Sequence, residues 1–573
     1  MRLPVSSPLA LAGLVALASL LTPAKADACG GTFCDSGPQV MPVDQTGETI
    51  AFWVDETGAE PFTEAHIQIQ YEGDAERFAW IIPVTAAPEV MVGSQALFDN
   101  LLAATVPTFT LQSASVGDCF GDSVGLCALR DLEANIDLAD DGFFSTGADD
   151  VGETGGNGPT IIERGFAGAF EYVTLTGDTV QEVVDWLDMA GYAQDPDAPP
   201  ILQEYLDEGF VFVAVKLRSG AGVDEIHPLT IRYPGTEPCI PIRLTRIAAV
   251  EDMAIRAFFL GDTQAASSNW PHVELNWAAL DWLNNSAASY DELVSLAIDE
   301  AGGRAFVTEF AGDDAIVSPN GLYGSKWNSA AFAEIAPELV IDELGVQGLF
   351  SCTVDWDDSL VCTGHPQVPA LLEIYLPTPV GVSDEDFWNC LSCYLDDIDP
   401  VAWAQQPGFA ADLEERIVVP GKHAVDMLND SSYLTRLYTR LSPVEMIEDP
   451  LFHLAAGLDD VAKDRSATNT SNCEGNDYLE LADGRVIAYD DNNALPDLDM
   501  PAADRIVRVP AMGPAQVETD NRDAIDDLID TWNKGRLEGP QPGCSVVGFE
   551  PEAVLTFMAI FGIAGLQRRR RRR

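Results

Sequence analysis

Short stretches in which apolar and polar residues alternate predict β-strands in the first part of the chain. Residues 65–71 alternate strictly, with Ile67 on the apolar face and His66 on the polar face, which indicates a half-buried strand whose His66 faces solvent. Residues 48–55 also predict a strand, and residues 77–84 predict one that is buried more deeply. The turn-like sequence EGDAE separates the stretches 65–71 and 77–84, so we expect these two to form a hairpin.

Apolar residues recur at helical spacing in three other stretches. Residues 94–104 and 179–192 predict helices, and residues 289–302 predict a helix that Ser289 caps and Gly302 ends. Further strand-like runs lie at residues 210–217, 229–233, 242–248 and 255–260. Because helices and strands interleave without regular βαβ spacing, we expect an α+β fold with mixed, largely antiparallel β-sheets and amphipathic helices.

The composition is that of a folded but strongly acidic protein. The chain has 573 residues, is 47% hydrophobic, and carries 92 acidic against 31 basic residues, which gives a formal net charge of −61. This hydrophobic content supports large cores. The charge repels nucleic acid, so we expect no nucleic-acid partner. It also attracts divalent cations, and calcium is the one cofactor left open, at the acidic stretches 137–159 and 490–504. Neither stretch fits an EF-hand, which favours solvated loops.

The N-terminus has the three parts of a secretory signal peptide. Arg2 precedes an apolar stretch at residues 9–21, and small residues follow where signal peptidase requires them. We therefore expect residues 1–28 to be removed and the remainder to be exported. A buried N-terminal helix and a lipoprotein start at Cys29 are the alternatives.

The C-terminus has an apolar run between a cysteine and a basic cluster. Residues 553–566 are uncharged and largely apolar, and six arginines follow at residues 568–573. By the positive-inside rule, such a cluster stays in the cytoplasm and leaves the preceding chain outside. With Cys544, the arrangement resembles the C-terminal sorting signals of myxobacterial surface proteins. The resemblance implies a short transmembrane segment, cleavage near Cys544 by a sorting protease, and anchoring at the cell surface. A membrane anchor that is never cleaved is the alternative.

The 11 cysteines predict disulfides in an exported chain. Setting Cys544 aside leaves an even number. Four pairs are close in sequence and a fifth follows by elimination, although spacing alone does not fix connectivity: Cys29/Cys34, Cys119/Cys127, Cys352/Cys362, Cys390/Cys393 and Cys239/Cys473. The CLSC sequence at residues 390–393 is either a redox centre or a tight structural bridge. The structural bridge is favoured because no thioredoxin-like context surrounds the sequence.

No group of residues in the sequence predicts a catalytic chemistry. GDSVG at residues 121–125 matches a nucleophile elbow centred on Ser123, but two cysteines bracket it in loop-like sequence, which favours a disulfide-closed loop. The six histidines are scattered, and none are four residues apart as in a His-Glu-x-x-His zinc helix. The tryptophans of residues 269–277 are expected in the core rather than in a carbohydrate groove. We therefore assign no catalytic, cofactor-binding or metal-binding residues.

Several segments together resemble the DUF2330 family, a bacterial family of exported proteins of unknown function. They lie between Cys29 and about Gly312 and include CGGTFC, PVDQTGETIAF, AHIQIQYEGDAERFAWIIPV, FVFVAVKLRSG, VELNW and DEAGGRAFVTEFAG. The resemblance implies an exported envelope protein and supplies no catalytic residues.

The chain is therefore expected to have five regions. These are a signal peptide (1–28), a DUF2330-like α+β region (29–340) with an acidic insertion at 119–159, a cysteine-containing α+β region (341–489), an acidic linker and helix (490–543), and the sorting signal (544–573).

The predicted function is that of an exported, surface-anchored envelope protein with a non-enzymatic binding, adhesion or structural role. The alternative is a surface hydrolase that acts on an extracellular polymer through residues far apart in sequence. The expected partners are signal peptidase, the sorting protease, the membrane through the C-terminal segment, and an unknown extracellular ligand.

Overall fold

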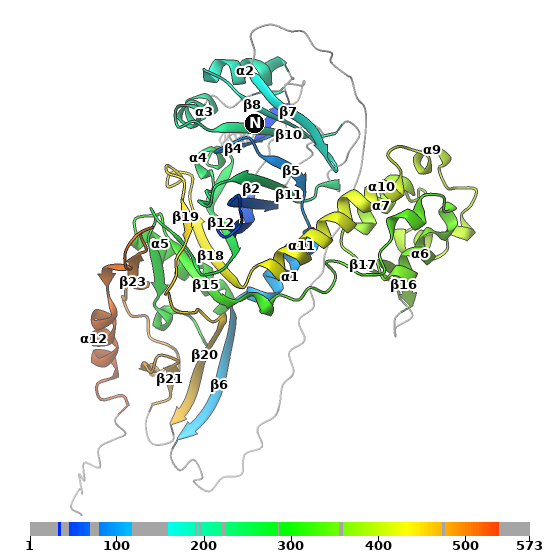
Figure 1. The fold of residues 1–573 in the computed structure, drawn as a ribbon. Coiled ribbons are helices and arrows are strands. Elements are labelled where there is room, and N and C mark those ends of the chain that lie inside the picture. Colours follow the sequence, from blue (N-terminus) through cyan, green and yellow to red (C-terminus); the bar gives the residue numbers. More distant parts are fainter. Residues whose placement is uncertain are drawn as a thin grey trace, which may run out of the picture.

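The computed structural model has the mixed α+β architecture expected from the sequence (Figure 1). It describes residues 32–35, 45–68, 79–116, 159–189, 192–193, 197–218, 225–284, 286–354, 359–472 and 476–537. The predicted signal peptide, almost all of the acidic insertion and the predicted sorting signal with its transmembrane segment lie outside these residues. Within them, no helix combines the length and the apolar character that crossing a bilayer requires.

Ten strands form the main sheet of the molecule. Their order is β24 (Gln516–Asp520), β23 (Ala503–Arg508), β14 (His272–Leu275), β15 (Phe306–Asp313), β18 (Tyr433–Leu441), β12 (Ala249–Gly261), β2 (Gln45–Asp55), β3 (Phe62–Gln68), β11 (Leu229–Pro234) and β5 (Glu89–Val92). Neighbours are antiparallel except that β12 pairs with β2, and β14 with β15, in parallel. The sheet thus combines strands from three of the regions expected from the sequence.

A six-stranded antiparallel sheet packs against one face of the main sheet. Its order is β7 (Thr160–Ala167), β8 (Phe170–Thr176), β10 (Val211–Leu217), β4 (Ala79–Val84), β1 (Thr32–Asp35) and β9 (Tyr192–Ala193). Ile50 and Phe52 of β2 share a buried cluster with Ile82 of β4 and Val213 of β10. Helices α2 (Val180–Met189) and α3 (Ala198–Asp207) cover the far side of this sheet.

Two helices cover the opposite face of the main sheet. These are α1 (Gln95–Thr105), which the Ser94 hydroxyl caps by accepting from the Leu97 N–H, and α11 (Val419–Asp430). Leu97 of α1 and Met427 of α11 pack with Phe258 of β12 in a buried cluster. The main sheet is therefore covered on both faces. Side chains on either face of its strands must be apolar or, if polar, must have hydrogen-bond or charged partners.

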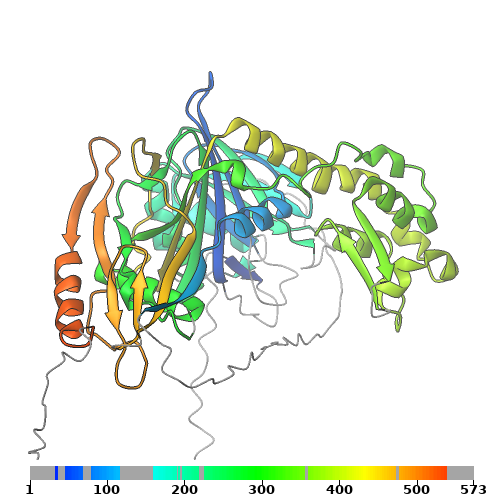
Figure 2. The same cartoon turned by 90° about the horizontal axis from the view of Figure 1, so that it is seen from below.

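Residues 323–418 form a lobe with its own core, which projects from the sheets (Figures 1 and 2). Its elements are α6 (Val340–Gln347), β16 (Phe350–Val354), β17 (Leu360–Gly364), α7 (Val368–Tyr375), α8 (Asp384–Asn389), α9 (Pro400–Trp403), α10 (Phe409–Leu413) and the π-helical turn η8 (Glu414–Val418). The turn η8 leads directly into α11. The lobe and the helix on the main sheet are therefore one continuous helical path.

The remaining elements are two smaller sheets and several short helices and turns. A four-stranded sheet has the order β22 (Val486–Ala488), β21 (Tyr478–Leu481), β20 (Asp464–Asn472) and β6 (Thr108–Val116), and a two-stranded one pairs β13 (Ala265–Ser267) with β19 (Phe452–Leu454). Further helices are α4 (Ile242–Thr245), α5 (Ser286–Glu300) and α12 (Arg522–Asn533), with short 3-10 turns at η3 (Trp277–Ala279), η4 (Asp314–Ile316), η5 (Ser329–Phe332), η6 (Pro337–Leu339) and η7 (Leu391–Cys393).

Three local predictions are wrong. The stretches 65–71 and 77–84 do not form a hairpin, because β3 pairs with β2 and β11 whereas β4 pairs with β1 and β10 in the other sheet. Residues 242–245 form α4 rather than a strand, because the chain turns helically after Pro241. The helix α5 begins at Ser286, because the Ser289 hydroxyl accepts from the Asp281 N–H instead of capping the helix.

Candidate metal centre

The strand β3 places Glu64 and His66 side by side on one face of the main sheet. Residues two apart on a strand point the same way, so these two side chains face α11 while Ala65 and Ile67 face the six-stranded sheet. In the sheet register, Glu64 lies between Trp53 of β2 and Arg232 of β11. The neighbouring strands therefore supply the flanks of the site.

The third residue of the site, His423, comes from α11. The helix lies so close to the turn at Leu322 that a Cβ on Gly421 would clash with the Leu322 carbonyl oxygen. Pro420 has no N–H to donate, and the preceding π-helical turn accommodates it, with the Val419 N–H donating to the Glu414 carbonyl. The turn and Gly421 together set the position of His423.

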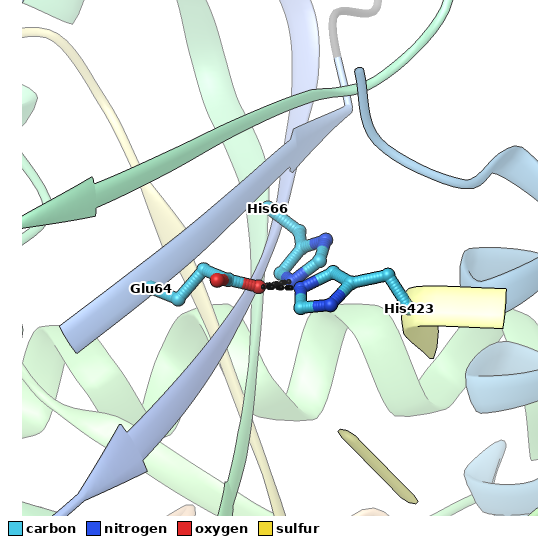
Figure 3. Close-up of side chains that lie close together, drawn as sticks. All are labelled: Glu64, His66 and His423. Carbon is cyan, nitrogen blue, oxygen red and sulfur yellow. Dashed lines mark hydrogen bonds and ion pairs between the residues drawn. The ribbon is translucent and has the colours of Figure 1, made fainter. Parts of the chain in front are cut away.

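Three potential ligand atoms converge between β3 and α11 (Figure 3). The Oε1 atom of Glu64 lies 2.8 Å from Nε2 of His66 and 2.5 Å from Nε2 of His423. All three atoms lie within 4.8 Å of one another. The two imidazole rings are roughly parallel, and their centroids are 6.0 Å apart. The Nε2 atoms of both rings contact the same carboxylate oxygen.

A second layer of contacts holds these side chains. Nε of Arg232 donates to Oε2 of Glu64 at 2.6 Å, so the other carboxylate oxygen alone faces the histidines. The hydroxyl of Thr230 lies 3.0 Å from Nδ1 of His66 and orients that ring. The Arg232 guanidinium in turn lies over the Phe62 ring, 4.4 Å from its centroid.

The Glu64 carboxylate is ionised. Its side chain is 0% exposed, and burial alone would raise its pKa, but the hydrogen bonds and charges of His423 and His66 outweigh burial and hold the pKa well below its usual range. His423 is 26% exposed and Arg232 31% exposed, so the site reaches solvent along the helix side. A buried anion with two imidazoles and a solvent path is suited to binding a cation.

The prediction that His66 faces solvent is wrong. The strand β3 does alternate, but α11 covers its polar face, and His66 is among the most buried polar residues. Three other histidines, His227, His272 and His365, are also buried, and burial lowers the pKa of each to about 4. Each of these rings accepts a hydrogen bond from a backbone N–H group; His227, for example, accepts from the Ala169 N–H.

Two of the predicted disulfides are present in the lobe. Cys352 and Cys362 lie opposite each other on β16 and β17 and are bonded, and so are Cys390 and Cys393. Cys239 has no disulfide partner within the described residues.

The other cysteine predictions are not tested. The side chain of Cys34 and the whole of Cys29, Cys119, Cys127, Cys473 and Cys544 lie outside what the structure describes.

Of the remaining candidates of the sequence, none that the structure describes joins the three ligand atoms. Ser123 and the acidic stretch 137–158 lie outside the described residues. In the second acidic stretch, Asp490 accepts from the Asn492 and Ala494 N–H groups, and Asp504 pairs with Arg485. Trp270 is buried against Phe306, as expected of a core tryptophan.

Sequence reasoning missed the site because its parts are remote. Within the described residues, Glu64, His66 and His423 are the one group of three or more His, Cys, Asp or Glu side chains arranged to hold a metal ion. The signal available in the sequence was the Glu-x-His pair on the polar face of an otherwise apolar strand. Nothing local to residue 423 identifies the third member.

A family model described as "Uncharacterized protein conserved in bacteria (DUF2330)" matches residues 23–320, more than half of the chain. The matched range contains Glu64 and His66, whereas His423 lies beyond it. No curated protein and no solved structure matches the chain.

Proposed function

The chain belongs to the DUF2330 family, and on this premise we propose that it is an exported envelope protein that binds a divalent transition-metal ion through Glu64, His66 and His423. The single observation that carries the metal-binding proposal is the convergence of one carboxylate oxygen and two imidazole nitrogens within 4.8 Å.

Zinc is the ion that this ligand set fits best. Two histidines and one carboxylate leave one position of a tetrahedral ion open, as in catalytic zinc sites. With bonds of about 2.1 Å, a tetrahedral ion separates its ligand atoms by about 3.4 Å. The Glu64 Oε1 atom lies 2.8 and 2.5 Å from the two nitrogens, so each imidazole needs to move back by less than about 1 Å. Imidazole and carboxylate ligands also suit iron(II) and copper(II). Elemental analysis of the purified protein shows which of these ions is bound.

The second layer of contacts matches a metal site. The Thr230 hydroxyl can accept from Nδ1–H of His66, which leaves the Nε2 lone pair free for an ion. Arg232 occupies Oε2 of Glu64 and leaves Oε1 as a monodentate ligand. The positive charge of Arg232 also partly balances the buried charge of Glu64.

The proposed location rests on the sequence of both chain ends and on the cysteines. The signal peptide of residues 1–28 and the Cys544, apolar run and arginine order support export and surface anchoring. The Cys352–Cys362 and Cys390–Cys393 bridges accord with an oxidising compartment. Intact-mass analysis of the protein taken from cells tests both ends. Full-length chain with its leader attached would refute the export proposal.

A metal-dependent surface hydrolase is the second candidate. The open coordination position and the partly exposed His423 favour it, because an ion there would carry a water molecule near solvent. The non-enzymatic role remains the first proposal, since the residues that flank the site are Arg232, Trp53 and Phe62, and none of these is a general base.

Metal analysis tests the proposal directly. We expect the purified protein to hold close to one equivalent of zinc after dialysis, and the H66A/H423A double variant to hold less than about one-tenth of that. The H453A variant is the matched control, because His453 is half-buried in β19 and is not one of the three converging residues. Equal zinc in the parent and the double variant, or no uptake of added zinc by the parent, would refute metal binding. Ester and glycan hydrolysis assays on the zinc-loaded protein then separate the two roles.

A further inference from the structure

A partly enclosed pocket lies between the main sheet and the six-stranded sheet. Its walls come from the inner faces of β2, β3 and β11 on one side and from β4 on the other, with α4 closing one end. Ala65 and Ile67 line it, and these residues alternate along β3 with Glu64 and His66. The pocket and the metal centre therefore open to opposite faces of the main sheet.

The walls of the pocket are almost entirely apolar. They include Ile50, Phe52, Ile67, Ile82, Val84 and Ile231. Trp80 and Phe210 are half-buried and Thr85 is exposed, so the pocket reaches the surface near these residues. Pockets that are apolar with a few polar groups are the usual form of small-molecule sites.

One carboxyl group interrupts the apolar lining. Glu48 is 4% exposed, and within the described residues its Oε2 atom has no hydrogen-bond partner. A buried polar atom without a partner is costly, and native proteins nearly always satisfy such atoms. Burial first, and the nearby negative charge of Asp449 second, raise the pKa of Glu48 to about 7. A ligand that supplies a positively charged hydrogen-bond donor would relieve both the missing bond and the unfavourable charge.

We propose that this pocket binds a small apolar amine, whose hydrocarbon part fills the space between the two sheets and whose ammonium group donates to Glu48. An alcohol satisfies the hydrogen bond but not the charge. A carboxylate ligand would add a further negative charge to those of Glu48 and Asp449. The order of affinity is therefore amine, then alcohol, then carboxylate. This inference does not depend on the metal centre.

Isothermal titration of the purified protein with three eight-carbon probes tests the order. We expect octylamine to bind at least tenfold more tightly than 1-octanol, and octanoate to show no measurable binding. The E48Q variant keeps the shape of the side chain but not its charge, so we expect its affinities for octylamine and 1-octanol to differ by less than threefold. The control is E445Q, which alters a carboxyl group that does not line the pocket, and it should behave as the parent.

Methyl NMR of isoleucine-labelled protein locates the bound probe. Octylamine should shift the methyl signals of Ile50, Ile67, Ile82 and Ile231, whereas the signal of Ile525, a buried residue of α12, should not move. The A65F variant fills the pocket and should remove binding of all three probes. Its circular dichroism and thermal midpoint check that it is folded, and E48Q tests the proposal on its own if it is not. No octylamine binding by the parent, or an unchanged amine preference in E48Q, would overturn the proposal.

Discussion

His423 Nε2 lies 2.5 Å from Glu64 Oε1, although the two residues are 359 positions apart in the chain. The carboxylate belongs to β3, between β2 and β11 in the main sheet, and the imidazole to the helix that leads out of the lobe. Any motion of α11 relative to the sheet therefore changes this distance directly.

Thr230 orients His66, so removing its hydroxyl should weaken metal binding without removing a ligand. We expect T230V to raise the zinc Kd by about 10- to 100-fold, the usual effect of losing such a supporting contact. The control is T439V, because the Thr439 hydroxyl is buried on the same sheet but has no hydrogen-bond partner within the described residues. Equal zinc affinities of the two variants, measured by competition with a chelator, would show that Thr230 does not orient His66.

Arg232 balances the buried Glu64 carboxylate, and a metal ion would take over that role. We expect R232M to lower the free energy of unfolding of the metal-free protein by about 3 kcal/mol, because it leaves a buried charge with one partner fewer. Zinc should then stabilise R232M more than the parent. The control is R304Q, which breaks the exposed pair with Glu448 and should cost less than about 1 kcal/mol. If zinc raises the thermal midpoint of R232M and of the parent equally, the zinc ion does not replace Arg232 in balancing the Glu64 carboxylate.

Gly421 allows α11 to approach the Leu322 carbonyl, so a larger residue should push the helix away. We expect G421A to destabilise the protein by about 1–3 kcal/mol and to weaken zinc binding at least tenfold, because His423 moves with the helix. G345A is the matched control, since its added Cβ would meet nothing closer than 3.6 Å. Urea denaturation and zinc titration of both variants measure the two effects. If G421A is destabilised but binds zinc as tightly as the parent, zinc binding does not depend on how closely α11 packs.

Glu48 should make stability depend on pH in a predictable direction. Its pKa is about 7 in the folded protein and near its usual value of 4.5 in the unfolded chain. The unfolded state therefore loses the proton first, and stability falls as pH rises from about 4.5 through 7. We expect E48Q to gain about 2–3 kcal/mol relative to the parent between pH 5 and pH 8 in urea denaturation. The exposed E56Q is the control, and an E48Q difference that is constant with pH would contradict the assignment.

The Cys352–Cys362 bridge closes a short loop within the lobe. The sequence separation of 10 predicts a stabilisation of about 2–3 kcal/mol from chain entropy. We expect C352S/C362S to lower the thermal midpoint while changing the zinc Kd by less than threefold, because neither cysteine lies in α11. The neighbouring pair S351A/T363A in the same hairpin is the control. A large loss of zinc affinity in the double variant would show that the lobe and the site are coupled.

Local sequence patterns predicted many of the individual elements. The strand at residues 48–55, the helix at residues 94–104 and the strand at residues 210–217 all appear, because each is encoded by its own periodicity. The pairing of strands was not predictable in this way. The hairpin expected between residues 65–71 and 77–84 failed because the two strands belong to different sheets, a choice made by distant partners.

The candidate site could not be predicted from local sequence patterns either, because it too depends on residues that are distant in the chain. The alternation around His66 correctly indicated two kinds of face on β3, but alternation cannot say what covers the polar one. The cover is α11, which is more than 350 residues away along the chain. A polar strand face that carries a carboxylate beside an imidazole can thus either be buried as part of a site or be exposed to solvent.

The position of β18 between β15 and β12 has a consequence for how the chain is completed. Residues 433–441 fill a gap in the middle of the main sheet, and they are synthesised only after the whole lobe. Until they arrive, β12 and β15 each present an unpaired edge, the kind of edge that recruits other chains into aggregates. If the chain is exported in an extended form, as we propose, these two edges stay unpaired until residues 433–441 have crossed the membrane.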